Sequence, residues 1–281
     1  MITKLKGFID LSSPHLFVVP GSLGVCGVFL SNPNPDAIFI LFGVLIPTIA
    51  WAGGQVFSNL FDSDFDRIKH PTWPIPSGTI SKKEAATYGL LLYSLCLIFA
   101  SFLNIYCFSI TLISLILATF YGYLGRLKQK GFYRNFCFGL VVASCILIGA
   151  STTRNISEVA IFAMIIAILI YTSDNIIGDI PNIEIERNLG FSTLPLQIGP
   201  KKSAEVAFIL MTFATILTLI FWIFGLNFSY LPLAIIALGS LLWTNIVLIK
   251  DPIKFGNLWI IHARYMGQIA LYFSFIVGAI G

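Results

Sequence analysis

Nine long apolar stretches occupy most of this 281-residue chain. Most approach the roughly 20 residues that a helix needs to cross a bilayer, about twice the length of a barrel strand. Only 11% of the residues are charged, less than half of the roughly 25% usual in soluble domains. We therefore predict an all-α, multi-pass integral membrane protein with nine transmembrane helices, at residues 15–31, 37–61, 84–103, 105–125, 135–151, 157–178, 204–225, 229–249 and 262–280.

The basic residues support this count and orient the chain. With a cytoplasmic N-terminus, 16 of the 17 Lys and Arg residues fall in or beside the five inside loops, and only Arg154 does not. Because cytoplasmic loops carry such an excess, we predict the N-terminus in the cytoplasm and the C-terminus on the opposite side. The net charge of +4 then reflects orientation in the lipid bilayer, not nucleic-acid binding. No obligatory protein partner is evident.

Two acidic segments share one spacing, and both follow an apolar stretch on the predicted cytoplasmic side. Offset by 120 residues, they contain Asn59, Asp62, Asp66 and Arg67, and then Asp179, Asn182, Glu186 and Arg187. Positions +3 and +7 stay on one face of a helix, so each segment offers stacked oxygen ligands followed by a cation. Mg²⁺ takes such oxygens and is usually shared with substrate phosphates. Two facing stacks would suit a diphosphate carried on two metal ions.

The first segment is the stronger metal candidate. Asp62 and Asp66 lie four residues apart and would repel each other on a helix without a neutralising cation. A solvated acidic helix end is the simpler explanation, but acids at a helix C-terminus oppose the macrodipole, which favours metal binding. The proline-rich stretch 71–76 predicts a rigid link, and Ser81 with Glu84 predicts a capping box at the start of the next helix.

The second segment is less regular. Asn182 is a neutral ligand and Pro181 interrupts the helix, so a polar helix end explains these residues about as well as a metal site does. Asp174 lies inside the apolar stretch 157–178, where an ionisable group is costly and functional by default.

Basic residues also gather in the loop after residue 125, where they would attract an anion on the same side as the acids. They are Arg126, Lys128, Lys130 and Arg134. The positive-inside rule alone explains most of them, and we expect one lysine, Lys128, to contact phosphate.

The repeated spacing suggests an internal duplication. Four predicted helices separate the two segments, and this even number returns the chain to the same side, so the repeat would be parallel. We predict a single domain over residues 1–281, with repeat halves at about 15–130 and 135–250. The halves would form two four-helix bundles around a central cavity open to the cytoplasmic side, with the ninth helix closing the ring.

These motifs resemble those of the UbiA-type intramembrane prenyltransferases. SNLFDSDFDRIKHPTWPIPSG, at 58–78, is similar to the family's first motif, N-D-x-x-D-x-x-x-D, which often ends in R-P-x-P-S-G. NIEIERNLGFSTLP, at 182–195, resembles the second, D-x-x-x-D followed by a Gly and often by T-L-P. YGYLGRLK together with Asn135 resembles the family's stretch between helices 4 and 5. With nine spans, the resemblance covers nearly the whole chain.

The chain departs from the family pattern at several positions. Ser58 and Asn59 stand where Asn and Asp are usual, and Trp73 stands in the place of an Arg. Asn182 and Glu186 replace two aspartates of the second motif. The resemblance therefore predicts a site with fewer negative charges than is usual, and with it weaker Mg²⁺ binding, an unusual substrate preference or lost activity.

The resemblance implies Mg²⁺-dependent transfer of a prenyl group from a polyprenyl diphosphate to a lipophilic or aromatic acceptor within the membrane. The implied catalytic residues are Asp62, Asp66 and Glu186, and the implied metal ligands are Asn59, Asp62, Asp66, Asp179, Asn182 and Glu186. The residues expected at the diphosphate are Arg67, Lys128 and Arg187, and those expected in the substrate cavity are Tyr123, Asn135, Tyr171 and Asp174.

Two other functions stay open on the residues alone. A terpene cyclase on the same fold would quench the allylic cation within one chain, and cyclic products formed without an acceptor would reveal it. A non-catalytic lipid or ion carrier would retain the fold without the chemistry, and the missing aspartates support that hypothesis. Mg²⁺-dependent diphosphate release that is lost in Asp62→Ala and Asp66→Ala would exclude the carrier.

Overall fold

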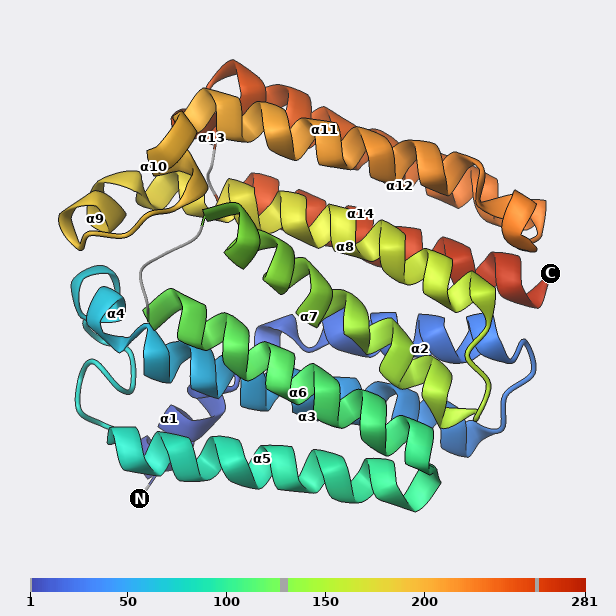
Figure 1. Cartoon of the computed structure of the whole chain (residues 1–281), viewed down its shortest axis with the longest axis horizontal. Helices are drawn as coiled ribbons and strands as arrows, with labels where there is room; N and C mark the ends of the chain where they lie inside the picture. The colour runs from blue at the N-terminus through green and yellow to red at the C-terminus, as the bar shows by residue number, and fades with distance from the viewer. Residues whose placement is uncertain (1, 127–130, 256–257) are drawn as a thin grey trace.

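Long helices run side by side along the longest axis of this computed structural model, which describes residues 2–126, 131–255 and 258–281 (Figure 1). They are α2 (Val18–Ser31), α3 (Ala37–Phe61), α5 (Lys82–Leu103), α6 (Ile105–Arg126), α7 (Gly131–Thr152), α8 (Glu158–Asp179), α11 (Pro200–Leu219), α12 (Leu231–Lys250) and α14 (Leu258–Ile280). The shorter helices are α1 (Ile2–Leu11), α4 (Ser63–Lys69), α9 (Ile183–Asn188), α10 (Leu194–Ile198) and α13 (Pro252–Phe255). Single 3₁₀ turns are η1 (Pro14–Leu16), η2 (Ile180–Asn182), η3 (Phe221–Phe224) and η4 (Phe228–Tyr230). No strand occurs in the described residues.

Eight of the long helices are long and apolar enough to cross a membrane, within the described ranges. The exception is α2, which has 14 residues and forms a ninth candidate span only together with the preceding helix, at a bend of 53°. The predicted all-α membrane fold is thus confirmed. The division into two pseudo-repeated bundles and the orientation of the termini stay predictions.

The segment before the first span differs from its expected structure. Residues 1–14 were predicted to form a cytoplasmic loop, but α1 occupies Ile2–Leu11. Ser13, whose φ of 51° lies in the left-handed region, and Pro14, which lacks a backbone N–H, follow the end of α1. The 53° bend comes next, between Leu16 and Val18. Leu5 and Ile9 remain exposed on α1, where a membrane interface would cover them.

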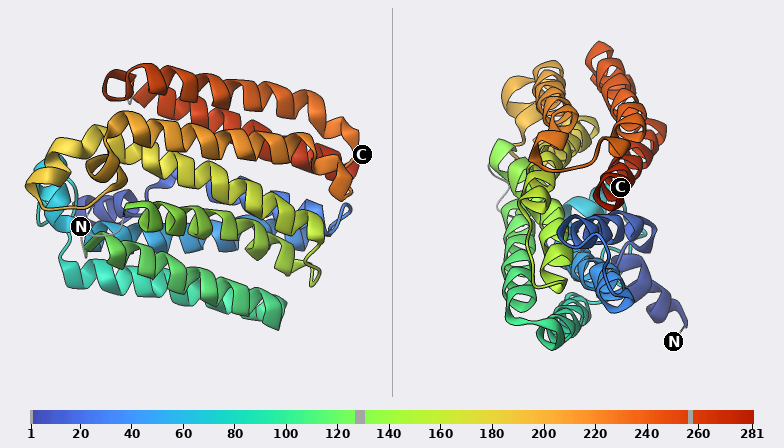
Figure 2. Two further views of the ribbon diagram at one scale, coloured as in Figure 1. Left: turned by 45° about the horizontal axis from the view of Figure 1, so that its top comes forward. Right: turned by 90° about the vertical axis from the view of Figure 1, so that its right-hand side faces the viewer.

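The long helices close into a ring (Figure 2). Helix α7 packs against α2, α3, α6 and α8, and the chain then passes through α11 and α12 to α14. Helix α14 contacts both α12 and α2, so the last span lies beside the first.

Glycines bring three of these helices into backbone contact. A Cβ at Gly24 of α2 would collide with the carbonyl of Gly43 in α3, and a Cβ at Gly149 of α7 would collide with the carbonyl of Gly24. Small residues at crossing points are how membrane helices approach closely. The contacts hold α3 and α7, which carry the walls of the cavities described below, in a fixed relation.

Local expectations on the connecting segments are also met. Ser81 and Glu84 form the capping box of α5, with Ser81 Oγ accepting from the Glu84 N–H at 3.2 Å and Glu84 Oε2 accepting from the Ser81 N–H at 2.9 Å. All five cysteines are buried and free, as expected of small hydrophobic side chains.

Candidate active site

Both acidic segments break their helix instead of continuing it. Helix α3 ends at Phe61 and α4 begins at Ser63, with Asp62 at the junction. Helix α8 ends at Asp179, and η2, which contains Pro181, leads into α9. The expectation of one continuous helical face is therefore wrong for the first segment, whereas in the second the 3₁₀ turn η2 interrupts a helical run over Glu158–Asn188. A short helix follows each break, α4 (Ser63–Lys69) in the first segment and α9 (Ile183–Asn188) in the second. The acids of the two segments are brought near each other because α4 packs against α9.

The two segments nevertheless face each other at one end of the molecule (Figure 1). Helix α4 contacts α9, and the rings of Phe65 and Phe191 meet edge to face with centroids 5.9 Å apart. Lys69 Nζ at the end of α4 donates to Asn182 Oδ1 at 2.6 Å. Two segments offset by 120 residues in sequence thus line one site.

Four carboxylates are withdrawn from solvent in this site. Asp66, Asp179 and Glu186 are 5%, 7% and 3% exposed, and the Asp62 side chain is 19% exposed. The neighbouring Asp64 and Glu184 face solvent. Because burying a charge is costly unless it is paired, this concentration favours nearby cations or protonation of some of these carboxyls.

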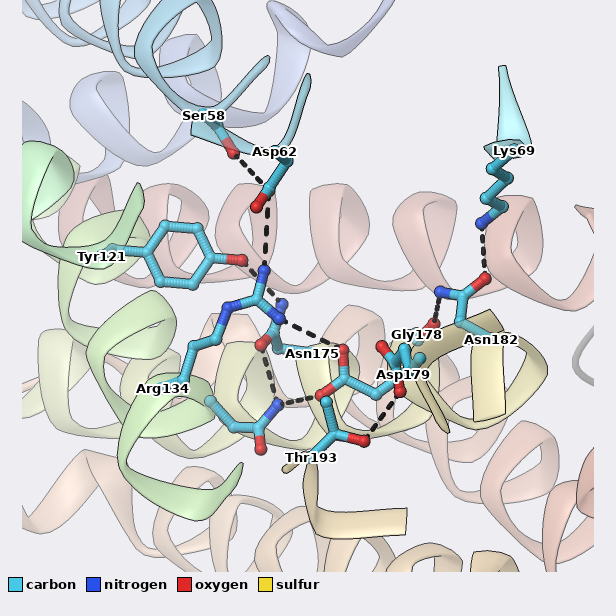
Figure 3. A network of polar contacts seen from close by, with 12 residues as sticks. Ser58, Asp62, Lys69, Tyr121, Arg134, Asn175, Gly178, Asp179, Asn182 and Thr193 are labelled. Atoms are coloured by element: carbon cyan, nitrogen blue, oxygen red, sulfur yellow. Dashed lines mark hydrogen bonds and ion pairs between the residues drawn. The ribbon is translucent and has the colours of Figure 1, made fainter. Parts of the chain in front are cut away.

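One such cation is Arg134, which lies between the two segments (Figure 3). Its Nη2 is 3.7 Å from Asp62 Oδ2, and its Nη1 is 3.7 Å from Asp179 Oδ1. The guanidinium also lies over the ring of Tyr121, 5.2 Å from the centroid. Arg134 therefore neutralises one carboxylate from each segment at once.

Amide side chains orient the second segment. Asn135 Nδ2 donates to Asp179 Oδ2 and to Asn175 Oδ1, both at 2.8 Å, and Asn175 Nδ2 donates to the Tyr121 hydroxyl at 3.3 Å. Asn135 was expected to line the substrate cavity, and the structure places it at the carboxylate of Asp179. It fixes the direction in which that carboxylate points.

The remaining acidic-segment residues have separate partners. Thr193 Oγ1, at the start of α10, donates to Glu186 Oε2 at 2.7 Å. Ser58 Oγ lies 3.5 Å from Asp62 Oδ2. Asn59 Nδ2 donates to the carbonyl of Leu11 at 3.2 Å, so this amide ties α3 to the end of α1. Its predicted part in metal binding stays a prediction.

The electrostatics of Asp66 follow from its surroundings. Burial, and to a smaller extent the negative charge of Asp62, raise the pKa of this carboxyl to about 7 against the opposing effect of Lys69. An opposite charge placed nearby would restore the ionised form. A divalent cation at this position would therefore displace a proton from Asp66.

The donor set fits Mg²⁺ in kind, since hard cations take carboxylate and amide oxygens. No group of three or more Asp, Glu, His or Cys side chains within the described part of the chain is arranged to hold a metal ion. Arg134 separates Asp62 from Asp179, and Lys69 contacts Asn182. Side-chain cations thus already lie where the two segments meet.

A narrow cavity of about 40 Å³ leads away from Ser58 into the apolar part of the molecule. Its lining runs from Ser58 and Tyr121 at the site to Ala50 and Ile148, a depth of roughly 12 Å along α3 at about 1.5 Å per residue. The walls are mostly apolar, as needed to hold a hydrocarbon chain. The space fits little more than one water molecule, so a longer occupant must push the lining side chains apart.

A second cavity of about 160 Å³ lies on the other side of Trp51 and Phe138. These two residues line both cavities, with ring centroids 6.4 Å apart. The second cavity is bordered by Tyr171, Asp174 and Asn175. The predicted lining positions Tyr171 and Asp174 thus border a cavity next to the acidic segments.

Other predicted site residues lie elsewhere. Tyr123 is 43% exposed and lines a membrane-facing groove between α5 and α6, whereas Tyr121, two residues earlier, faces the site. Arg67 and Arg187 are exposed on α4 and α9. Lys128 lies outside the described residues. The proposed contacts of these basic residues with diphosphate stay predictions.

Comparison with known proteins decides the family. The model of the UbiA prenyltransferase family matches residues 17–254. The chain belongs to this prenyltransferase family. A digeranylgeranylglyceryl phosphate synthase of Pyrococcus furiosus is 30% identical over 252 residues, covering 89% of each chain. The enzyme of that name from Pyrococcus horikoshii is 30% identical over 98% of each chain.

Solved structures show the same fold for this UbiA-family protein. A digeranylgeranylglyceryl phosphate synthase structure superposes with a TM-score of 0.76 at 26% identity, over 99% of both chains. A UbiA homologue from Archaeoglobus fulgidus, bound to GPP and Mg²⁺, superposes with a TM-score of 0.77 at 19% identity, over 98% of this chain and 99% of that one.

Sequence reasoning missed Arg134 as a site residue of this UbiA-family protein. It was grouped among four basic residues that would attract an anion, but Lys128 was chosen among them as the phosphate contact, and the fifth span was started at residue 135. Helix α7 in fact begins at Gly131, so Arg134 lies inside the helix, one residue before the buried Asn135. The available signal was the adjacent Asn135, which matches the family's pattern between helices 4 and 5 and so marks this part of the chain as close to the site.

Proposed function

We propose that this protein transfers a prenyl group, with Mg²⁺, from a polyprenyl diphosphate to a lipophilic acceptor within the membrane. The observation that carries the proposal is the set of three buried carboxylates and the partly buried Asp62, drawn from two segments, next to two cavities that share an aromatic wall. The names of the relatives favour geranylgeranylglyceryl phosphate as the acceptor and geranylgeranyl diphosphate as the donor.

The acidic segments would receive the diphosphate end of the donor. Asp62 and Asp66 would hold one Mg²⁺, with Asn59 assisting, and Asp179, Asn182 and Glu186 would hold the second. The metals would neutralise the charge that develops on the leaving diphosphate. Asn135 and Thr193 would keep Asp179 and Glu186 turned toward the site through the hydrogen bonds already described. Ordered ligands of this kind lower the reorganisation needed when the bond breaks.

The two cavities would separate donor from acceptor. The narrow cavity beyond Ser58 suits the donor's hydrocarbon chain, and the second cavity suits the acceptor. The C1–O bond of the donor breaks with its electron pair on the diphosphate, and the acceptor oxygen then bonds to C1 and loses its proton. Trp51 and Phe138 would form the apolar wall between the two hydrocarbon chains. The dry, apolar surroundings of the reacting carbon would keep water from capturing the allylic cation.

A reconstituted transfer assay tests this function. The full chain in liposomes, given geranylgeranyl diphosphate, geranylgeranylglyceryl phosphate and Mg²⁺, is expected to form digeranylgeranylglyceryl phosphate, detected by mass spectrometry. Chelating the Mg²⁺ should stop the product. Parallel reactions with an aromatic acceptor test the acceptor class. Cyclic hydrocarbons formed without any acceptor would show that the protein is a terpene cyclase and not a transferase. If no acceptor leads to diphosphate release, the result would support a non-catalytic carrier.

A further inference from the structure

The guanidinium of Arg134 lies between the two acidic segments, and the proposed reaction gives it no part beyond neutralising their carboxylates. We propose that Arg134 is a diphosphate-binding residue that changes partners during loading. It bridges Asp62 and Asp179 in the metal-free protein and turns its N–H groups to the phosphate oxygens when Mg²⁺ engages those carboxylates. This inference rests on the proposed function and adds a specific residue and an exchange of partners to it.

The bonding of Arg134 is incomplete. Both of its carboxylate contacts are 3.7 Å long, whereas charge-assisted hydrogen bonds measure about 2.7–2.9 Å. Its Nε is buried and has no hydrogen-bond partner among the described residues. A guanidinium carries five N–H donors in a planar fork that matches a carboxylate or a phosphate. The fork is therefore placed near two anions without being saturated by either.

The surroundings hold this fork at the site. The ring of Tyr121 supports one face of the guanidinium, and the next residue on α7, Asn135, is bonded to Asp179. The Arg134 side chain is only 15% exposed. A buried, supported and unsaturated cation is suited to receive an anion that enters the same space.

The charges predict how metal and diphosphate affect this residue. Mg²⁺ alone would compete with Arg134 for Asp62 and Asp179, and two cations at one place repel each other. Diphosphate that enters with the metal would give the guanidinium a new partner. Arg134 therefore opposes the binding of metal alone and favours the binding of metal together with diphosphate. A counterion with only a structural role would also oppose the binding of metal alone, but it would not favour the binding of diphosphate.

Calorimetric titration of the purified full chain tests the opposition. Mg²⁺ is titrated alone, and inorganic pyrophosphate is titrated at saturating Mg²⁺. In Arg134→Gln we expect Mg²⁺ alone to bind several-fold tighter and pyrophosphate to bind about 10- to 100-fold weaker, the range for losing a hydrogen bond to a charged group. Arg154→Gln, which removes the same charge from an exposed position at the opposite end, should change neither affinity.

Arg134→Lys keeps the charge but loses the fork, and it guards against a misfolded Gln variant. We expect it to bind Mg²⁺ as the wild type does and pyrophosphate about tenfold more weakly. Unchanged pyrophosphate binding in both variants, or a parallel weakening of Mg²⁺ and pyrophosphate in Arg134→Gln, would overturn the inference. If the wild-type chain itself binds no pyrophosphate with Mg²⁺, the proposed function fails first.

Discussion

Two arginines that are largely withdrawn from solvent lie beside carboxylates in this protein, and they differ in how completely they are bonded. Arg264 of α14 donates from Nε to Asp174 Oδ1 at 2.8 Å and from Nη2 to the same oxygen, and its Nη1 donates to Thr244 at 3.2 Å. Gln268 donates to the other oxygen of Asp174. Arg134 approaches two carboxylates but reaches hydrogen-bond distance with neither.

The difference separates a fully bonded ion pair from the proposed diphosphate site. Asp174 and Arg264 satisfy each other and join α8 to α14, with α12 attached through Thr244. The site around Arg134 has four carboxylates and fewer side-chain cations, so its charges are balanced only when further cations arrive. Burial alone therefore does not identify a functional charge, whereas incomplete bonding of a buried charge does.

Asp62→Asn should produce the largest effect on the site around Arg134, which is called the open site below because Arg134 is not fully bonded. It removes a charge that the proposed metal and Arg134 both use, so we expect prenyl transfer to fall at least about 10³-fold, equivalent to roughly 4 kcal/mol. The rate is measured by product formation at saturating substrates. Asp64→Asn, on the exposed face of α4, is the matched control and should stay within about twofold. A rate for Asp62→Asn within tenfold of the wild type would remove Asp62 from the mechanism.

Among changes to the ion pair of Asp174 and Arg264, Arg264→Gln should have the largest effect on stability. It leaves Asp174 buried without its counterion, which costs about 3 kcal/mol of unfolding free energy, measured by denaturant titration. Added Mg²⁺ should not recover this loss, whereas it should recover stability in Arg134→Gln. Equal recovery in the two variants would contradict the distinction between the two arginines. Replacing the pair together, as Arg264→Met with Asp174→Leu, should restore most of the stability.

The pKa of Asp66 predicts a pH dependence that is confined to the open site. The pKa of about 7 means that protons compete with metal below neutrality, so Mg²⁺ affinity should rise about tenfold between pH 6 and pH 8. Asp66→Asn should bind more weakly and keep only a shallower slope, because the pKa of Glu186 is also raised to about 7 by burial and by the charge of Asp179. In the metal-free protein the same shift makes Asp66 destabilising as pH rises from about 4 to 7, because the folded state holds the proton that the unfolded state has released. A flat Mg²⁺ affinity in the wild type would exclude Asp66 as a ligand.

Tyr121 should have the smallest effect. Tyr121→Leu removes the ring beneath Arg134, which contributes about 1 kcal/mol, and should weaken pyrophosphate binding about fivefold at saturating Mg²⁺. Tyr121→Phe keeps the ring and should stay close to the wild type. If the two variants bind alike, the ring does not position the guanidinium.

The fold could be predicted from the sequence because bilayer thickness and backbone hydrogen bonding leave few alternatives to a long apolar helix. The predicted stretch 157–178 lies within one residue of α8 at each end. Helix ends were less predictable where a helix extends into polar residues or an apolar stretch continues beyond the helix. The stretch 204–225 was predicted as one helix, but α11 runs from Pro200 to Leu219 and η3 follows it.

The site was predictable in its anions and not in its cations. The spacing of Asp62, Asp66 and Glu186 identified both segments, although each turned out to be a broken helix. Arg134 is far from them in sequence, and its charge fits the positive-inside rule equally well. Only the packing of α7 against α3 and α8 shows that its side chain enters the site.

Diffraction from crystals grown with Mn²⁺ and pyrophosphate tests the central claim, that the two acidic segments jointly hold metal and diphosphate. Anomalous scattering should locate one ion at Asp62 and Asp66 and a second at Asp179 and Glu186. Pyrophosphate should lie between them, with Arg134 at hydrogen-bond distance from a phosphate oxygen. Mn²⁺ or pyrophosphate bound away from both segments would contradict the account.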